Sequence, residues 1–519
     1  MKKVILSIFL TASVLISCSD AYEAEQPTNR DDEKIVFANA DEIQRGINGL
    51  YSGFNIESEI NFVSYFTDEL GVGISNAGQG VNDGSYTFLL TPANDFATSH
   101  WGANMNIINR VNRMLSRVEQ LYIETPADKD KLDNNKALLL SFRAYCHYKL
   151  FAYYTPDYKD PSGPSIIKFD FLQTDDYSRL EKRSTVSEIV RFIEDDINEA
   201  KELGIVNVND NSFIRSSFLD AILVKLYSMT ENYDGLEEAF NRMTTQNVGS
   251  VFQHLGMFSD DLGARQNNPD VILRLERRVN QGGGVAGAWY SDLVGIDAGM
   301  IYMEMGRSLY NEFDKLDPSQ TGNGPGEGRN DVRYGINVLA TSLVAENYQN
   351  LSQDDYKEKD VLLIGKYPGR GAAPLQNDVY VFRYTDMLLS LAEKRAAQNN
   401  INGPSVLNDF SNVESIIYHI RANRSANGIP SAMPNITNQQ SAYKAILDER
   451  RVEFAFEGYR YLDMRRLGVK AGSSGFVRDQ QDCASTNACE LQANSFKLIL
   501  PIPSTEIISN NRMVQNPGY

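Results

Sequence analysis

ILDERRVEFAFEGYRYLDMRRLG, residues 446 to 468, is the most strongly patterned stretch of this chain. Its first half places three carboxylates at four-residue spacing, at Glu449, Glu453 and Glu457. Side chains at this spacing share one face of a helix. Gly458 is expected to end that helix, and charged residues then recur at three-residue spacing, at Arg460, Asp463 and Arg466. The stretch therefore predicts a helix junction that is dense in charge.

Two interpretations of this charge are open. An enzyme such as a glycosidase would use Glu449 or Glu453 in an active site. A structural network would instead pair the carboxylates with the neighbouring arginines. Because the two signs alternate and neutralise each other, the sequence favours the structural network.

Helical periodicity extends far beyond this stretch and predicts a mostly α protein. Apolar residues recur at three- and four-residue spacing in Ala103–Tyr122, for example, which forms one apolar stripe. The expected helices are Asp41–Phe54, Ala103–Tyr122, Asp128–Tyr154, Val186–Leu203, Ser216–Thr230, Asp234–Met243, Asp378–Asn399, Val413–Ser425 and Ser441–Glu457. They mostly come in pairs, and Ser216–Met243 resembles a tetratricopeptide hairpin, although no strict 34-residue period runs through the chain.

Two regions, residues 68–100 and 244–376, have a different texture. Gly and Asn become frequent and the helical periodicity fades, as in QGGGVAGAW at 281–289. Short apolar runs at 271–273 and 361–364 suggest brief strands between long loops. Because loops of this length in a compact protein are usually functional or disordered, we expect a helical scaffold that carries ligand-binding loop regions.

The chain starts with MKKVILSIFLTASVLISC, residues 1 to 18. Two lysines precede an apolar run, Val4–Ile16, that is too short to span a bilayer, and a small residue stands before Cys18. This pattern is typical of a bacterial lipoprotein signal peptide over residues 1–17. Cys18 would then begin the mature chain and carry more than one acyl chain, such as palmitate. An ordinary secretory signal peptide is the alternative.

The segment that follows the signal, residues 19–37, is acidic and polar. Such a composition is typical of chain that does not fold on its own. We therefore expect residues 18–37 to form a lipidated, flexible tether or strap, and residues 38–519 to form one large folded domain.

Composition limits the partners. The 519 residues are 42% hydrophobic, which is enough to bury a large core, and no later stretch reaches the roughly 18 consecutive apolar residues of a membrane helix. The lipid would thus be the only membrane attachment. A formal net charge of -18 argues against nucleic acid and anionic lipid headgroups as partners.

Three cysteines remain besides Cys18. Cys483 and Cys489 bracket the polar loop CASTNAC, a spacing that suits a local disulfide in an oxidising compartment, with free thiols as the alternative. Cys146 lies in a helical, aromatic segment, so we expect it to be a buried apolar residue.

The sequence offers little catalytic chemistry. The four histidines are widely separated, and no HExxH pair, nucleophile elbow, phosphate-binding loop or dinucleotide fingerprint occurs. Asp68 and Glu69 are adjacent and would point to opposite faces of an extended chain, which makes them a poor acid and base pair. We expect no catalytic residue, no cofactor and no metal. A structural calcium ion near Asn82, Asp83 and Asp95 is possible but not indicated by any EF-hand spacing.

Several segments, in this order along the chain, together resemble the SusD/RagB family. They are the lipoprotein start, RYTDMLL at 383–389 followed by Ala392-Glu393, IRANR at 420–424, the ERRVEFAFEGYRYLDMRRLG block, LPIP at 500–503 and QNPGY at 515–519. Each is weak alone, but jointly they are specific and cover the whole chain.

The resemblance implies a fold, a location and a role. The fold would be a single SusD-like domain with four tetratricopeptide-like helix pairs, long loops and a few short strands. The location would be the cell surface, where the protein is anchored by lipid to the outer membrane. The role would be that of a lid on a SusC-like TonB-dependent transporter, which captures oligosaccharides or, in the RagB branch, oligopeptides. Such lids carry out no chemistry.

Sugar rings present flat C–H faces and a rim of hydroxyls, so glycan sites combine aromatic side chains with polar ones. Two loop segments offer that mixture. The expected ligand-binding residues are Asn76, Gln79, Asn82, Asp83 and Tyr86 in the first segment, and Trp289 and Tyr290 in the second. Trp101 opens a long amphipathic stretch, for which we expect a packing role.

Glycan capture is thus the favoured function, and an oligopeptide-binding lid of the RagB type is the alternative. Two tryptophans in the whole chain are few for a protein that grips glycans by stacking, although 27 tyrosines could substitute. An enzyme is a distant third.

Overall fold

The computed structural model describes residues 34–73, 76, 81, 84–172, 180–206, 208–259, 261–277, 301–318, 329–367 and 377–519. Within them the chain is mostly helical and forms a single domain. The signal peptide, Cys18, Gln79, Asn82, Asp83, Trp289 and Tyr290 lie outside the described residues.

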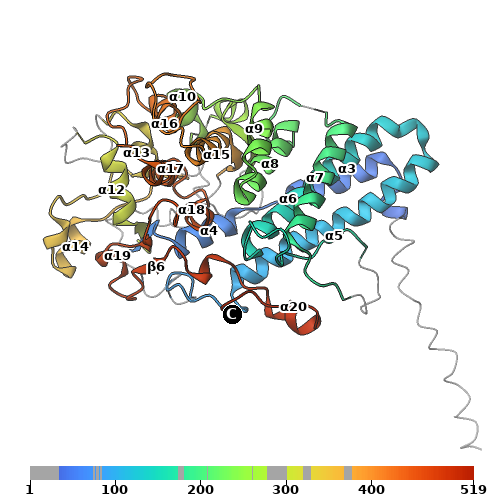
Figure 1. The fold of residues 1–519 in the computed structure, drawn as a ribbon, viewed down its shortest axis with the longest axis horizontal. Coiled ribbons are helices and arrows are strands. Elements are labelled where there is room, and N and C mark those ends of the chain that lie inside the picture. The colour runs from blue at the N-terminus through green and yellow to red at the C-terminus, as the bar shows by residue number, and fades with distance from the viewer. Residues whose placement is uncertain are drawn as a thin grey trace, which may run out of the picture.

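Long helices form one end of the molecule (Figure 1). They are α3 (Ala40–Gly53), α5 (Asp95–Glu124), α6 (Lys129–Tyr154) and α7 (Val186–Leu203), with α4 (Glu57–Phe66) beside them. α6 packs between α5 and α7 and is buried on nearly all sides over its second half, as expected of a helix that is apolar all round. Trp101 lies in α5 with only 1% of its surface exposed and meets Tyr154 edge-on, which confirms its packing role.

Shorter paired helices continue the scaffold. α8 (Ser216–Thr230) and α9 (Tyr233–Asn241) form a hairpin and pack on α15 (Tyr384–Ala397). α15 in turn packs on α16 (Val413–Ala422) and α17 (Gln439–Glu453), and α18 (Arg460–Leu467) packs on α17. Consecutive helices thus pair as the tetratricopeptide-like pattern predicts.

The strands form three separate two-stranded antiparallel ladders within the described residues. β1 (Leu70–Val72) pairs with β3 (Met303–Met305), β2 (Val271–Leu275) with β4 (Val379–Arg383), and β5 (Gly475–Val477) with β6 (Glu490–Gln492). The remaining short helices are α10 (Val251–Met257), α11 (Leu262–Gln266), α12 (Arg307–Lys315), α13 (Val332–Asn337), α14 (Gln353–Lys359), α19 (Gln480–Cys483), α20 (Ser504–Ser509) and the 3-10 turns Pro126–Asp128, Tyr348–Asn350 and Phe496–Leu498.

Several expectations need correction. The helix expected to end at Gly458 already ends at Glu453, and the one expected over Ala103–Tyr122 begins at Asp95. The predicted helix Asp378–Asn399 begins as strand β4, because a short continuous apolar run fits a buried strand as well as a helix. Region 244–376 contains short helices as well as loops. The apolar run at 361–364 makes isolated bridges through Val361 and Ile364 rather than a strand.

The cysteines behave as predicted. Cys483 and Cys489 form a disulfide that closes the loop after α19, and Cys146 is a buried free thiol. Most of the buried apolar side chains join one cluster that runs from α3 to the C-terminal segment. No helix among the described residues is long and apolar enough to cross a membrane.

Candidate functional site

The β1–β3 ladder joins the two loop segments that the sequence singles out. Val72 lies opposite Met303, and the Gly73 amide donates to the Tyr302 carbonyl oxygen over 3.0 Å. The segment that contains Gln79, Asn82 and Asp83 therefore leaves β1 at the point where the segment that contains Trp289 and Tyr290 enters β3. One short ladder thus tethers both predicted ligand loops, although they are far apart in sequence.

Asn76 reinforces this junction. Its side-chain Nδ2 donates to the Tyr302 carbonyl oxygen over 2.8 Å, and the residue is half-buried. An amide committed to the neighbouring backbone is less available to a sugar hydroxyl. Asn76 therefore fixes the base of the first loop, and its predicted contact with ligand stays a prediction.

Tyr86 is a correction. Its side chain is fully buried, its hydroxyl donates to the Asp482 carbonyl oxygen over 2.8 Å, and the Arg478 guanidinium lies 3.8 Å from its ring centroid. A ring with no exposed surface cannot stack on a ligand in this structure. The residue is part of the core because an aromatic ring in a Gly-rich segment can anchor that segment as readily as it can serve a binding surface.

The base of the ladder is rigidly held. The Gly306 amide donates to the Glu69 carbonyl oxygen over 2.7 Å, and the Arg307 amide donates to the Asp482 side chain over 2.8 Å. Gly71 lets Asp482 approach closely, because a Cβ there would lie 2.5 Å from Asp482 Oδ1. The disulfide loop begins at Cys483, the residue after Asp482. It therefore braces the buried surroundings of β1, formed by Asp68, Glu69, Glu304 and Asp482, which we call the floor beneath β1.

Several carboxyl groups in this floor have perturbed pKa values. Burial raises the pKa of Glu69 and of Asp482 to about 7 each, and raises that of Glu304 well above its usual range. Burial also opposes ionisation of Asp68, yet the Arg451 and Arg460 guanidiniums lower its pKa to about 2. The surroundings of β1 therefore combine one firmly ionised carboxylate, Asp68, with two carboxyl groups, Glu69 and Asp482, whose pKa values lie near neutral pH.

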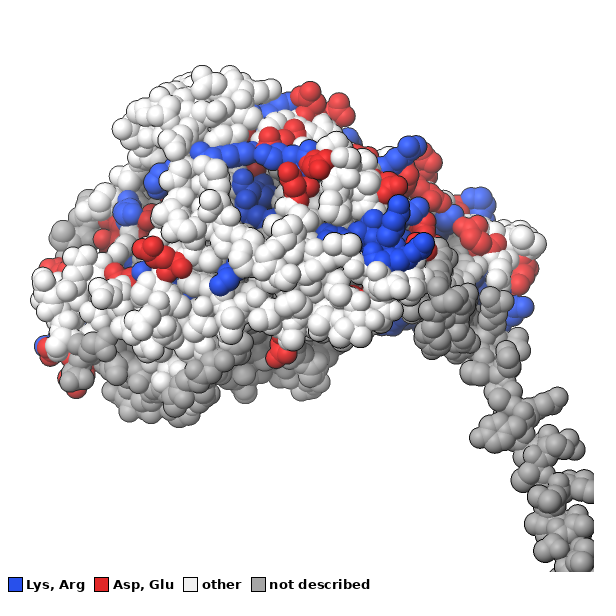
Figure 2. Space-filling model, turned by 60° about the horizontal axis from the view of Figure 1, so that its bottom comes forward, with Lys and Arg blue, Asp and Glu red and all other residues white. Residues whose placement is uncertain are grey.

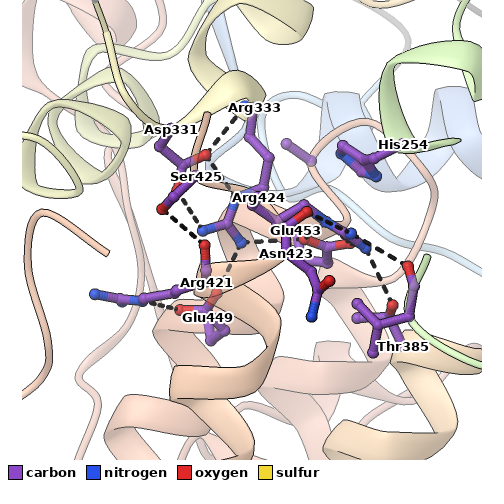
Figure 3. A network of polar contacts seen from close by, with 12 residues as sticks. His254, Asp331, Arg333, Thr385, Arg421, Asn423, Arg424, Ser425, Glu449 and Glu453 are labelled. Carbon is purple, nitrogen blue, oxygen red and sulfur yellow. Dashed lines mark hydrogen bonds and ion pairs between the residues drawn. The ribbon is translucent and has the colours of Figure 1, made fainter. Parts of the chain in front are cut away.

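The patterned stretch at 446–468 forms the ion network that the sequence favours (Figure 3). Glu449 accepts from Arg333 and Arg421, both over 2.7 Å. Glu453 accepts from Arg383, from Arg424 over 2.9 Å and from Arg333 over 3.1 Å. All of these carboxylates are buried, so neither Glu449 nor Glu453 is open to a substrate.

His254, Asp270 and Glu453 bring three potential metal-ligating atoms within 4.8 Å of one another. Arg383 and Arg424 already occupy the space between the two carboxylates, with Arg383 Nη2 2.8 Å and Arg424 Nη2 3.3 Å from Asp270 Oδ2. A cation would meet two guanidiniums there. The donor set fits an ion-pair cluster and not a metal centre.

The other histidines offer no general base. Burial lowers the pKa of His147 to about 3 and those of His100 and His419 to about 4.

The face of the molecule in Figure 2 carries charges of both signs, interspersed with broad areas of uncharged residues.

Family models, a curated relative and solved structures all liken this chain to SusD-like proteins. The SusD family model matches residues 368–519, and a second model, described as starch-binding associating with outer membrane, matches residues 23–247. A curated relative, SusD-like protein P38 of Formosa agariphila, is 23% identical over 553 aligned positions, which cover 99% of this chain and 98% of that protein.

Solved structures share the fold. A SusD superfamily protein from Bacteroides thetaiotaomicron superposes with a TM-score of 0.69 at 20% identity, over 92% of this chain and 100% of that one. A protein from Bacteroides vulgatus described as a putative sugar-binding protein superposes with a TM-score of 0.65 at 19% identity, over 93% of this chain and 99% of that one.

Proposed function

We propose, because this chain is a SusD-like protein, that it captures oligosaccharides at the cell surface and delivers them as the lid of a SusC-like TonB-dependent transporter in the outer membrane. Proteins of the family bind ligands and are not enzymes. The carboxylates at 449–457 are buried and paired with arginine or lysine side chains, which agrees with a protein that binds a ligand without reacting with it.

The observation that carries the proposal is the β1–β3 ladder. It brings together the ends of two Gly- and Asn-rich segments that contain Trp289, Tyr290, Gln79, Asn82 and Asp83. Aromatic faces stack on sugar rings, and amide and carboxylate groups bind the hydroxyl rim. A ligand held between two loops with one common base would gain contacts from both.

Lipidation of Cys18 would supply the membrane attachment. The described chain begins at Lys34, near the start of α3, at the end of the molecule formed by the long helices (Figure 1). The residues between Cys18 and Lys34 could span up to about 55 Å if fully extended. Such a tether would let a lid swing open without leaving its transporter.

Isothermal titration calorimetry of the purified mature protein against a panel of oligosaccharides and a protease digest tests the proposal. We expect saturable heat with at least one oligosaccharide and none with the peptides. Saturable peptide binding without any glycan response would instead identify a lid of the RagB type, with which the small number of tryptophans is compatible.

A further inference from the structure

A polar groove of about 440 Å³ lies between α12, α17 and the turn that precedes β5. Asp68, Arg451 and Arg460 lie at its base, Ser308 lines it beside them, and Ser474 lies at its rim. We call it the α12–α17 groove. Its volume falls within the range of small-molecule binding sites.

Two guanidiniums at the base of the groove share one carboxylate. Arg460 binds Asp68 through Nε and Nη2, at 2.8 and 2.9 Å, and Arg451 Nη2 lies 3.1 Å from the same carboxylate. All three side chains are more than nine-tenths buried. Since Asp68 carries a single negative charge, the two guanidiniums outnumber by one the carboxylate that they share.

Several guanidinium donors at this base also lack acceptors. Arg451 uses Nη2 alone, for the Asp68 carboxylate, the Asp68 carbonyl oxygen and Ser308 Oγ. Among the described residues, Arg451 Nε and Nη1 and Arg460 Nη1 meet no acceptor. Of these atoms only Arg451 Nε is fully buried. The Nη1 atoms of both arginines reach solvent, so they can donate to an oxyanion that enters the groove.

The rim of the groove does not supply this anion. Lys315 pairs with Glu312 over 2.7 Å, and Lys444 pairs with Asp448 over 2.5 Å. Ser474 also lies at the rim and is exposed. None of the residues that line the groove is aromatic. Recognition there would rely on charge and hydrogen bonds rather than on stacking.

We propose that the α12–α17 groove binds the carboxylate of an acidic saccharide, a uronate residue, through Arg451 and Arg460. This inference rests on the proposed function, because it names the class of glycan. Each arginine can donate from Nη1 to a carboxylate, and such charge-assisted bonds are about twice as strong as neutral ones. Asp68, at the base of the groove, lies two residues before β1, whose ladder with β3 joins the ends of the predicted loop segments.

Calorimetry with a matched ligand pair tests the inference: an oligogalacturonate and its methyl ester, which has the same rings without the charge. We expect the acid to bind at least about tenfold more tightly than the ester. Higher ionic strength should narrow this difference. Equal affinity for acid and ester would overturn the inference but leave oligosaccharide capture intact, whereas a protein that binds peptides and no saccharide would overturn both.

Two variants locate the site. Ser474→Glu places a negative charge in the groove at an exposed position and should weaken binding of the acid by about fivefold. Arg451→Lys keeps the charge but removes the Nη1 donor, and should weaken binding of the acid as well. Ser52→Glu, on the exposed face of α3, adds the same charge elsewhere and serves as the control. If Ser474→Glu, with wild-type thermal stability, binds the acid as tightly as Ser52→Glu does, the groove is not the site.

Discussion

Gly73 donates its backbone amide to the carbonyl oxygen of Tyr302 over 3.0 Å, at the end of the β1–β3 ladder. This bond connects two segments that the sequence places on opposite sides of the α5–α9 scaffold. The sequence predicts each segment as a ligand-binding loop on its own composition. Their common base brings the ends of both segments together, as a site built from both would require.

Glu69 makes stability depend on pH. Its pKa is about 7 in the folded protein, above the ordinary 4.5, so the group favours folding fully below about pH 4.5 and loses that effect as the pH rises through 7. Glu69→Gln is neutral at every pH. Its stability relative to wild type should therefore rise by up to about 3 kcal/mol between pH 5 and 8. Urea unfolding at both pH values measures this, and a relative stability that stays constant or falls would show that Glu69 is already ionised at pH 5.

Glu453 is the centre of the buried ion network. Glu453→Gln removes the negative charge that Arg383, Arg424 and Arg333 share. Because these guanidiniums are buried, we expect the free energy of unfolding to fall by more than about 3 kcal/mol. Glu42→Gln breaks an exposed pair with Arg45 and should cost no more than about 1 kcal/mol. Equal losses in the two variants would contradict the structural role of the network.

The Cys483–Cys489 disulfide should contribute about 2 kcal/mol, as expected for closing a short loop. Reduction with TCEP should lower the melting temperature of the wild type. The double variant Cys483→Ser, Cys489→Ser should melt lower from the start and not respond to TCEP. If the melting temperature of the wild type does not change in TCEP, although a thiol assay shows that the disulfide is reduced, the disulfide does not brace the floor beneath β1.

Trp289 is the principal aromatic residue predicted to contact ligand. We expect Trp289→Ala to weaken oligosaccharide binding by roughly tenfold while the melting temperature stays near that of wild type, since a ring that stacks on ligand contributes little to folding. Trp101→Ala is the matched control, because Trp101 is buried in α5 and its loss should cost about 3–5 kcal/mol of stability. A large drop in melting temperature for Trp289→Ala would instead assign that residue to the core.

Local patterns predicted the scaffold well. α7 and α8 begin and end at the predicted residues. In α7 the apolar stripe is bounded by a Thr185–Glu188 capping box and by Gly204. The sequence predicts a helix where strand β4 lies, because Val379–Phe382 is a continuous apolar run, which periodicity alone does not distinguish from a helix.

The site depended on contacts that no local pattern contains. Asp68 and Glu69 precede β1 in sequence, yet Asp68 meets Arg451 and Arg460, and Glu69 meets the Phe456 amide, all from the distant stretch at 446–468. The sequence drew attention to both segments through their charge. Only the folded structure shows that the two segments lie together, because contacts between residues so far apart in sequence depend on tertiary packing.

Hydrogen–deuterium exchange with and without a saturating oligosaccharide tests the central claim most directly, namely that the two loops joined at the β1–β3 ladder hold the ligand together. We expect amides in both 73–88 and 286–303 to gain protection on binding, while those at the ends of α5 and α7 stay unchanged. Protection in only one of these segments, or only elsewhere in the molecule, would contradict a site built from both loops.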